Sequence, residues 1–340
     1  MAFRIQEDIS LSSFTTFKTG GCAKYLAQVT TIDELRTALV FAEQKQVPYF
    51  VLGSGSNVLG PDSGYAGLII LMQLKGREYH DESEAVVFAT FAAGELFDDV
   101  IAETVDLGMW GLENLSHIPG TVGATPVQNV GAYGVEVSSL ITGLSVFNCQ
   151  ENKIELYTNQ HCQFAYRDSC FKRSNQSHLI ILGVTFKLSK VAAPQLEYAD
   201  LAVLRSNTAV ALSVVRTTII AIRSTKFPDW QHVGTAGSFF KNPIISSADS
   251  EALVKNFPQL PVYIIDESTV KVSLGFILDK ICGLKGCRRG KIHLSEVQAL
   301  VLIADTGATT TDIILFSKFI TDEVKIKTGI DIEQEVTLLM

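Results

Sequence analysis

The chain has 340 residues, of which 47% are hydrophobic and 19% are charged, a balance typical of a well-buried globular protein and not of a disordered or fibrous one. The formal net charge of −8 excludes a general nucleic-acid binder, because duplex binding requires a basic surface. The six cysteines contain no CxxC pair and the six histidines no HxxxH spacing, so we expect reduced thiols and no metal site. The length predicts two or three domains.

The first residues, MAFRIQEDIS, contain no basic stretch followed by an apolar core, so we expect no signal peptide and a cytoplasmic protein. The run that most resembles a membrane span extends from Ala209 to Ile222. Arg216 interrupts it, and it is shorter than a bilayer span. It therefore predicts a buried amphipathic helix and no membrane partner.

The first part of the chain alternates strand and helix signals. AKYLAQV predicts a strand, and Thr31 to Glu34 form a capping-box pattern followed by apolar residues at helical spacing. PYFVL (48–52) and AGLIIL (66–71) predict two further strands, the first of which ends in the glycine-rich GSGSN. These elements indicate a small α/β unit over roughly the first 70 residues.

Strand-like runs dominate from Ala85 to Leu188, with one helical run between Glu95 and Leu107, which predicts an α+β domain. The strand-like runs are AVVFATFAA, LSVFN, KIELYT and LIILGVTFKL. A helix is expected from about Thr208 to the breaker at 227–229, which is a domain boundary in this interpretation.

Beyond this boundary, the sequence predicts a further domain. SADSEALVKNF and SLGFILDKICGL indicate helices, and ALVLIA indicates a core strand. The run from Thr309 to Lys327 predicts a helix with Ile313, Phe316, Ile320 and Val324 on one face. IDIEQEVTLL predicts a last strand.

Two glycine-rich segments are candidates for ligand binding. The amides of GSGSN, after a strand, can wrap a phosphate, although Val58 stands where a Rossmann motif has its third glycine and an ordinary turn stays equally open. PGTVGATPVQNVGAYG (119–134) contains four glycines and two prolines, so it suits backbone wrapped around a ligand better than an ordinary connecting loop.

These two segments, together with FAYRDS (164–169) and AGSFFKNP (236–243), closely resemble the UDP-N-acetylenolpyruvoylglucosamine reductase family of bacterial cell-wall synthesis. The resemblance covers nearly the whole chain. It implies an α+β fold, in which an FAD-binding fold of the vanillyl-alcohol-oxidase type carries an additional α/β substrate-binding domain. The implied domains are 1–72 and 73–225 for FAD and 226–328 for substrate, with the C-terminal strand 329–340 packed back on the FAD-binding part.

The resemblance also implies the activity, which is the NADPH-dependent reduction of UDP-N-acetylglucosamine enolpyruvate to UDP-N-acetylmuramate. FAD would be bound non-covalently, NADPH would be the co-substrate, and the protein would be a monomer. The residues implied in FAD binding are Gly53, Ser54, Gly55, Ser56, Asn57, Pro119, Gly120, Gly123, Ala124, Thr125, Gln128, Asn129, Gly131, Ala132, Tyr133 and Arg223.

Further segments resemble substrate-binding parts of the family. LEYADL (196–201) is similar to the tyrosine loop of the form that has an extra substrate-covering segment, the stretch 223–226 is similar to a basic stretch, and 298–301 is similar to a late glutamine strand. The residues implied in binding the UDP-linked enolpyruvyl amino sugar are Tyr166, Tyr198, Lys226, Asn242 and Gln298.

Three residues are implied in catalysis. Arg167 would hold the substrate carboxylate and the charge that develops beside it, and Glu335 would polarise the same end in a protonated or proton-sharing state. Ser238 would deliver a proton to the α-carbon. Read without the resemblance, each has a structural alternative: an ion pair between Arg167 and Asp168, a turn or cap serine, and a solvated edge glutamate.

The chain departs from the family's usual pattern at four positions. Ala124 and Thr125 stand where serines are common, so one hydroxyl contact to the flavin pyrophosphate is in doubt. Gln334 replaces a common proline, and Thr337 stands where a basic residue is common. None of the four departures removes a catalytic group.

Two other functions stay open at this point. One is an oxidase of the same flavin fold, and the other is a non-catalytic paralogue that binds flavin or UDP-sugar. A proton donor combined with an anion clamp suits reduction of an enol ether and is not required for alcohol oxidation. Because all three catalytic candidates are present, the reductase is the favoured hypothesis.

Overall fold

The computed structural model describes residues 3–206 and 209–339, and the chain forms two compact units. The first unit comprises Met1–Ile9, Lys24–Ser54 and Ala66–Arg223, and the second comprises Ser10–Ala23, Gly55–Tyr65 and Ser224–Met340. The second unit thus combines most of the C-terminal part of the chain with two short segments from the N-terminal part. The three-domain division with borders at 72, 225 and 328 stays a prediction.

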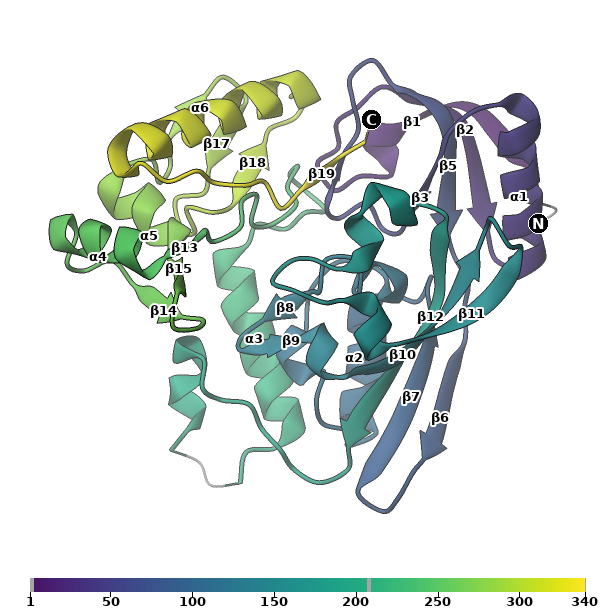
Figure 1. Cartoon of the computed structure of the whole chain (residues 1–340), viewed down its shortest axis with the longest axis horizontal. Coiled ribbons are helices and arrows are strands. Elements are labelled where there is room, and N and C mark those ends of the chain that lie inside the picture. The colour runs from purple at the N-terminus through teal and green to yellow at the C-terminus, as the bar shows by residue number, and fades with distance from the viewer. Residues whose placement is uncertain (1–2, 207–208, 340) are drawn as a thin grey trace. The chain divides into compact units, whose positions relative to one another are not determined.

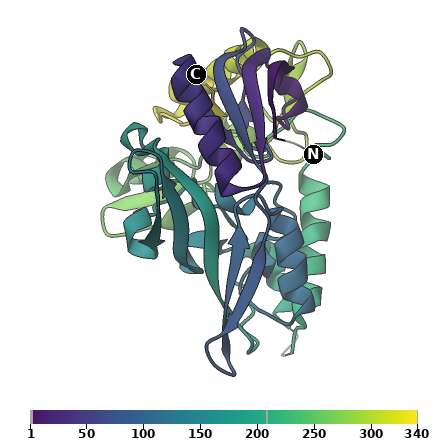
Figure 2. The ribbon, with the colours of Figure 1, turned by 90° about the vertical axis from the view of Figure 1, so that its right-hand side faces the viewer.

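Four strands of the first unit form a sheet in the order β1-β2-β5-β3, and helix α1 covers one face of this sheet (Figures 1 and 2). The predicted capping box begins α1, since the Thr31 hydroxyl accepts the Glu34 N–H and the Glu34 carboxylate accepts the Thr31 N–H, both at 3.2 Å. Leu35, Ala38 and Ala42 are buried against the sheet. The elements are β1 (Ile5–Ser10), β2 (Cys22–Val29), α1 (Ile32–Lys45), β3 (Tyr49–Leu52) and β5 (Tyr65–Met72).

The second sheet of this unit is antiparallel, with strand order β11-β10-β12-β7-β6. Its central strand β12 is buried on both faces, because Ile181 and Phe186 join one core and Ile180 and Leu182 join another. This double burial explains the apolar run LIILGV (179–184) at the start of the strand. The strands are β6 (Arg77–Asp81), β7 (Val86–Ala92), β10 (Ile141–Asn148), β11 (Lys153–Thr158) and β12 (Leu179–Ser189).

Helices α2 (Phe97–Asp106) and α3 (Leu212–Lys226) supply residues to the core on one face of this second sheet. The predicted start of α3 at Thr208 lies outside the described residues. Arg216, which interrupts the apolar stretch, donates two hydrogen bonds to the Asp98 carboxylate on α2, at 2.7 and 3.1 Å. Within residues 3–206 and 209–339, no helix is both long and apolar enough to span a membrane.

The second unit contains small sheets and the helices α4, α5 and α6 around its own core. The antiparallel sheets have the orders β13-β15-β14 and β16-β17-β18, and β4 pairs in parallel with β19. The elements are β4 (Val58–Leu59), β13 (Ile244–Ser246), α4 (Ser247–Asn256), β14 (Val262–Ile264), β15 (Thr269–Val272), α5 (Leu274–Phe276), β16 (Arg288–Arg289), β17 (Ile292–Leu294), β18 (Leu302–Ala304), α6 (Thr310–Thr328) and β19 (Thr337–Leu338).

Helix α6, the yellow helix of Figure 1, confirms the predicted helix after Thr309. The Thr309 side chain accepts the Asp312 N–H at 3.0 Å, and the Asp62 carboxylate accepts the N–H groups of Thr310 and Thr311, both at 2.8 Å. The carboxylates of Asp62 and Asp312 therefore both lie at the N-terminus of α6, where they stabilise the positive end of the helix dipole. The four residues predicted on one face, Ile313, Phe316, Ile320 and Val324, are all buried.

Three predictions for this unit are wrong in extent. SLGFILDKICGL forms only the short α5 followed by a π-helical turn at Ile277–Ile281, and only Leu302–Ala304 of ALVLIA is a strand. Of IDIEQEVTLL, only Thr337–Leu338 forms a strand. The backbone groups of the residues before this strand hydrogen-bond to different segments and do not form one continuous ladder. Their alternating apolar side chains are buried in the core of the second unit.

Candidate active site

The two glycine-rich segments meet in the first unit. A β-carbon at Gly53 would lie 2.4 Å from the hydroxyl oxygen of Thr121, so only glycine fits at this point. Behind the contact, the Val122 N–H donates to Glu95 O and the Gly123 N–H donates to Ala93 O, both at 2.9 Å. The segment 119–134, called the flavin loop below, is thus fixed from behind next to the start of α2.

Several non-glycine residues in and around the flavin loop have a left-handed backbone. The φ values are 47° at Asn129, 48° at Tyr133, 61° at His117 and 53° at Arg167. Each such residue costs about 1 kcal/mol or more, and such strain concentrates at functional sites because surrounding contacts must impose it.

Asn129 shows how these contacts impose the loop conformation. Its buried side-chain amide donates to the Glu136 carboxylate at 2.9 Å and to Ala165 O at 3.0 Å, and its Oδ1 accepts the Ser138 N–H at 3.1 Å. Both amide protons are therefore used within the protein. The hydroxyl of Thr125 similarly turns inward to Val122 O at 2.8 Å, so the polar side-chain groups of both residues are used within the protein.

Arg167 extends from a tight turn onto the flavin loop. Ala165 and Asp168 exchange two backbone hydrogen bonds, of 3.0 and 3.1 Å, which close the turn around it. Its guanidinium donates to Gly131 O at 2.6 Å and to Asn129 O at 3.4 Å. The half-buried guanidinium also lies 5.4 Å from the ring centre of the neighbouring Tyr166. These contacts place its charge beside the loop that was predicted to hold the flavin.

A second arginine, Arg223 near the end of α3, borders the same loop. It donates to His117 O at 3.1 Å and hydrogen-bonds to Tyr133, while burial lowers the pKa of the guanidinium. Burial raises the pKa of Tyr133, which therefore stays neutral near pH 7. The Tyr198 ring packs edge-on against Tyr133, with 5.3 Å between ring centres. This packing brings the predicted tyrosine loop to the flavin loop.

Ser238 lies in the second unit, in an extended segment held on both sides. It forms an antiparallel bridge with Val301, and the next residue, Phe239, donates to Leu300 O at 2.9 Å. Gly237 supplies a left-handed turn with φ 74°, and Ser238 itself is half-buried. The serine is therefore fixed by backbone pairing and is not a helix cap.

Glu335 lies on the other side of this segment. Its N–H donates to Phe239 O at 2.9 Å, directly beside Ser238. Its carbonyl accepts the side-chain amide of Asn57 at 3.0 Å, and Thr337 N–H donates to Asn57 O at 3.0 Å. Residues from three distant parts of the sequence thus fix the backbone of Glu335 next to that of Ser238.

Gln298 also lies near Ser238, although it stands in a turn and not in the strand that was predicted. Its carbonyl accepts the N–H of Val301, the bridge partner of Ser238, at 2.9 Å. The Asn242 side chain accepts the Leu274 N–H at 3.0 Å at the start of α5. Lys226 is the half-buried last residue of α3.

The predicted residues therefore fall into two groups. The first unit holds Gly53, Ser54, Pro119, Gly120, Gly123, Ala124, Thr125, Gln128, Asn129, Gly131, Ala132, Tyr133, Tyr166, Arg167, Tyr198 and Arg223. The second unit holds Gly55, Ser56, Asn57, Lys226, Ser238, Asn242, Gln298 and Glu335.

Sequence reasoning missed the residues that support the flavin loop. Asp98 accepts the His117 N–H at 2.6 Å and is bound by Arg216. Burial alone would raise the pKa of Asp98, but these hydrogen bonds outweigh it and lower the pKa, so the carboxylate stays charged. Glu136 and Asn114 were missed as well. None of these residues lies in a sequence motif that also contains its hydrogen-bond partner. Arg216, for example, lies 118 positions from Asp98.

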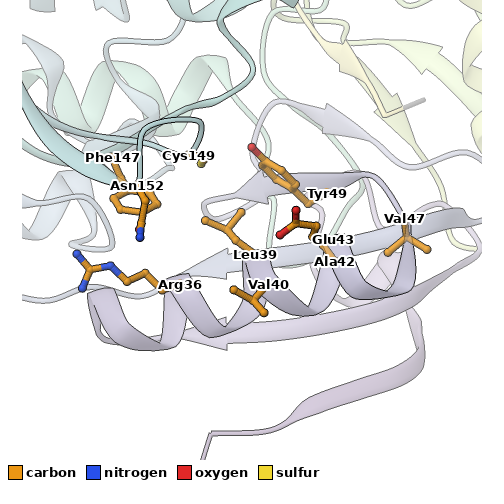
Figure 3. Close-up of a pocket in the computed structure, with 10 residues that line it drawn as sticks. All are labelled: Arg36, Leu39, Val40, Ala42, Glu43, Val47, Tyr49, Phe147, Cys149 and Asn152. Atoms are coloured by element: carbon orange, nitrogen blue, oxygen red, sulfur yellow. The ribbon is translucent and has the colours of Figure 1, made fainter.

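A separate surface cavity of about 420 Å³ lies on α1 and the end of β10 (Figure 3). None of the predicted site residues lines it. Its arginine, Arg36, already donates to Asp33 at 3.0 Å and lies 5.7 Å from the ring centre of Phe147. The lining residues are Arg36, Leu39, Val40, Ala42, Glu43, Val47, Tyr49, Phe147, Cys149 and Asn152.

Comparisons with known proteins give the family. Residues 23–156 match a family model described as an FAD binding domain, and residues 229–339 match the C-terminal domain of UDP-N-acetylenolpyruvoylglucosamine reductase. The reductase of that name from Bacteroides fragilis is 39% identical over 336 residues, which cover 98% of this chain and 100% of the relative. The chain belongs to the UDP-N-acetylenolpyruvoylglucosamine reductase family.

Other members of the family extend this result. The enzyme of the same name from Bdellovibrio bacteriovorus is 37% identical, with 98% of each chain covered. The crystal structure of the family member from Thermus caldophilus shares the fold at 23% identity, with a TM-score of 0.70 and 100% of both chains covered. The predicted α+β fold, with an FAD-binding domain and an additional C-terminal domain, is confirmed.

Proposed function

We propose that the protein reduces UDP-N-acetylglucosamine enolpyruvate to UDP-N-acetylmuramate, with FAD as bound cofactor and NADPH as reductant, in the synthesis of peptidoglycan precursors. Full-length similarity to reductases of this name supports the proposal. The observation that carries it is the hydrogen bond between Glu335 N–H and Phe239 O, which holds the backbone of Glu335 next to that of Ser238, a second catalytic candidate.

The residues of the first unit fit a flavin dinucleotide. At Gly53 the glycine loops approach too closely for any side chain, so backbone amides are the groups presented there, and such amides suit a pyrophosphate. Arg223, which hydrogen-bonds to His117 O and to Tyr133 of the flavin loop, would supply positive charge there. FAD would be held non-covalently by the predicted residues, and when bound it supplies the hydride that it accepts from NADPH.

The three catalytic candidates have distinct roles in the reduction. When hydride adds to the β-carbon of the enolpyruvyl group, negative charge develops on the α-carbon and its carboxylate. Arg167 binds this carboxylate and stabilises the charge, and Glu335, in a protonated or proton-sharing state, hydrogen-bonds to the same end. Ser238 then donates a proton to the α-carbon.

The UDP-sugar is assigned to Tyr166, Tyr198, Lys226, Asn242 and Gln298. The exposed Tyr198, packed on the flavin loop, supports assignment to the form of the family with a tyrosine substrate loop. Lys226 contributes a charge for the diphosphate, which an acidic protein must supply locally. We further propose a cytoplasmic location, since the substrate is a soluble nucleotide sugar, and the monomeric state stays a prediction.

The decisive experiment follows the flavin absorbance without oxygen. NADPH is expected to bleach the bound flavin, and the enolpyruvyl UDP-sugar is expected to restore its colour. If oxygen restores the colour rapidly and the sugar does not, the protein is an oxidase. If the protein binds UDP-sugar but never consumes NADPH in its presence, it is a non-catalytic paralogue. A colourless protein that FAD does not reconstitute would overturn the proposal.

Replacement of Lys226 by alanine is expected to raise KM for the UDP-sugar about 10- to 100-fold, because a hydrogen bond to a charged group is lost in ground and transition states alike. Flavin reduction by NADPH should change little. Lys45→Ala, at the end of α1, is the matched control because it removes the same charge from another helix C-terminus. Steady-state and stopped-flow kinetics measure both quantities, and an equal loss in the two half-reactions would contradict the assignment.

A further inference from the structure

One buried side chain joins the tyrosine loop to the flavin loop. Asn114 is fully buried in the short turn after Leu112, and its amide nitrogen donates two hydrogen bonds of 2.8 Å each. One goes to the carbonyl of Tyr133 in the flavin loop, and the other goes to the carbonyl of Gln195. Gln195 lies three positions before Tyr198 and begins the segment that carries it.

The chemistry of the two acceptors requires an amide at this position. Carbonyl oxygens only accept hydrogen bonds, so the NH₂ group of Asn114 must face both of them and its orientation is fixed. An aspartate side chain at this position would place a carboxylate oxygen against the two carbonyl oxygens. A buried carbonyl without a donor costs free energy, which makes this double donation a strong constraint on both segments.

The remaining contacts of the segment converge on the same region. The Tyr198 ring packs on the ring of Tyr133, the residue whose carbonyl Asn114 binds. Leu201 is fully buried in the core of the first unit, and Arg205 donates back to Leu196 O at 2.8 Å. Tyr198 itself is 45% exposed, so its position depends on the anchored residues on either side of it.

We propose that Asn114 is a positioning residue for the sugar half of the reaction. By holding Gln195 on Tyr133, it fixes the start of segment 195–204 to the flavin loop and keeps Tyr198 where the UDP-sugar binds. The proposal rests on the proposed function, because the substrate of this segment is the UDP-sugar. It adds a residue that acts through two backbone carbonyls and makes no contact with the substrate.

Replacement of Asn114 by aspartate removes both donors at almost constant volume. We expect KM for the enolpyruvyl UDP-sugar to rise about 10- to 100-fold, as loss of two hydrogen bonds implies, with flavin reduction by NADPH within about twofold of wild type. Amide exchange of residues 196–204 should accelerate in the holoenzyme. Lowering the pH should partly restore KM in Asn114→Asp, because only a protonated carboxyl has an O–H to donate.

The matched control is Asn159→Asp. The Asn159 amide also donates to two carbonyls, Ser138 O at 2.7 Å and Ile141 O at 2.9 Å, in the same unit. It should lose stability without the rise in KM or the faster exchange at 196–204. Asn114→Ser, which retains one hydroxyl donor, is the second variant and should give an intermediate KM.

The outcomes separate this proposal from the function on which it rests. If the wild-type protein does not turn over the enolpyruvyl UDP-sugar, the proposed function fails. If the wild type is active but KM and exchange at 196–204 are unchanged in Asn114→Asp or in Asn114→Ser, the positioning role is refuted. Loss of FAD binding with unchanged KM would assign Asn114 to the flavin loop alone, and this result also overturns the proposal.

Discussion

Replacement of Ser238 by alanine is expected to lower turnover of the UDP-sugar roughly 100- to 10,000-fold, the effect typical of losing a positioned general acid. The backbone at Ser238 is held by Val301 on one side and by the pairing of Phe239 with Glu335 on the other. The substitution therefore removes a hydroxyl without releasing the segment. FAD binding and flavin reduction by NADPH should stay close to wild type, because the proton is needed only after hydride transfer.

Stopped-flow spectroscopy tests this prediction by timing each half-reaction. Reoxidation of the reduced flavin by the sugar should become the slow step in Ser238→Ala, whereas KM should change little because the proton is donated only in the transition state. Ser250→Ala, which removes a buried hydroxyl from α4 of the same unit, is the matched control. Full turnover in Ser238→Ala would make the serine structural, and loss of flavin reduction would move it to the flavin or nicotinamide site.

Local signals predicted the larger elements of the fold. The capping boxes at Thr31 and Thr309 involve residues three positions apart, so the sequence alone contains both partners. The double burial of the first part of β12 likewise appears as an apolar run, LIILGV (179–184). In the second unit, the sequence signals covered only β18 and β19 and overestimated their length, because strands of two to four residues are specified by tertiary pairing and not by their own periodicity.

The candidate site likewise has features that the sequence predicted and features that it did not. Glycines and charged residues within motifs could be identified from the sequence, since the motifs carry them together. The contacts that hold these residues in place could not be predicted. Asn114 bridges carbonyls 19 and 81 positions away, and Asn57 binds Glu335 across 278 positions. The inward hydroxyl of Thr125 and the protein-bound amide of Asn129 were equally hidden, since a motif specifies a residue and not the direction of its side chain.

Arg167 both contacts the flavin loop and is a catalytic candidate. The left-handed backbone at φ 53° projects its guanidinium onto Gly131 O and Asn129 O, and the Ala165 to Asp168 turn fixes this geometry. Two of its donors are thus used on the flavin loop. The planar fork of an arginine can bind a planar carboxylate through two parallel hydrogen bonds, whereas a lysine ammonium would have to bind it as a point charge.

We therefore expect Arg167→Lys to lower turnover of the UDP-sugar about 100- to 1,000-fold, as removal of one stabilising donor does at an oxyanion. Unlike Ser238→Ala, it should also raise KM, because the substrate carboxylate is present in the ground state as well as in the transition state. Flavin reduction by NADPH, followed by absorbance, should persist. Arg173→Lys is the matched control, since Arg173 is an exposed arginine of the same segment that binds Gln163. Unchanged kinetics in Arg167→Lys would show that positive charge alone suffices and would contradict a bidentate clamp.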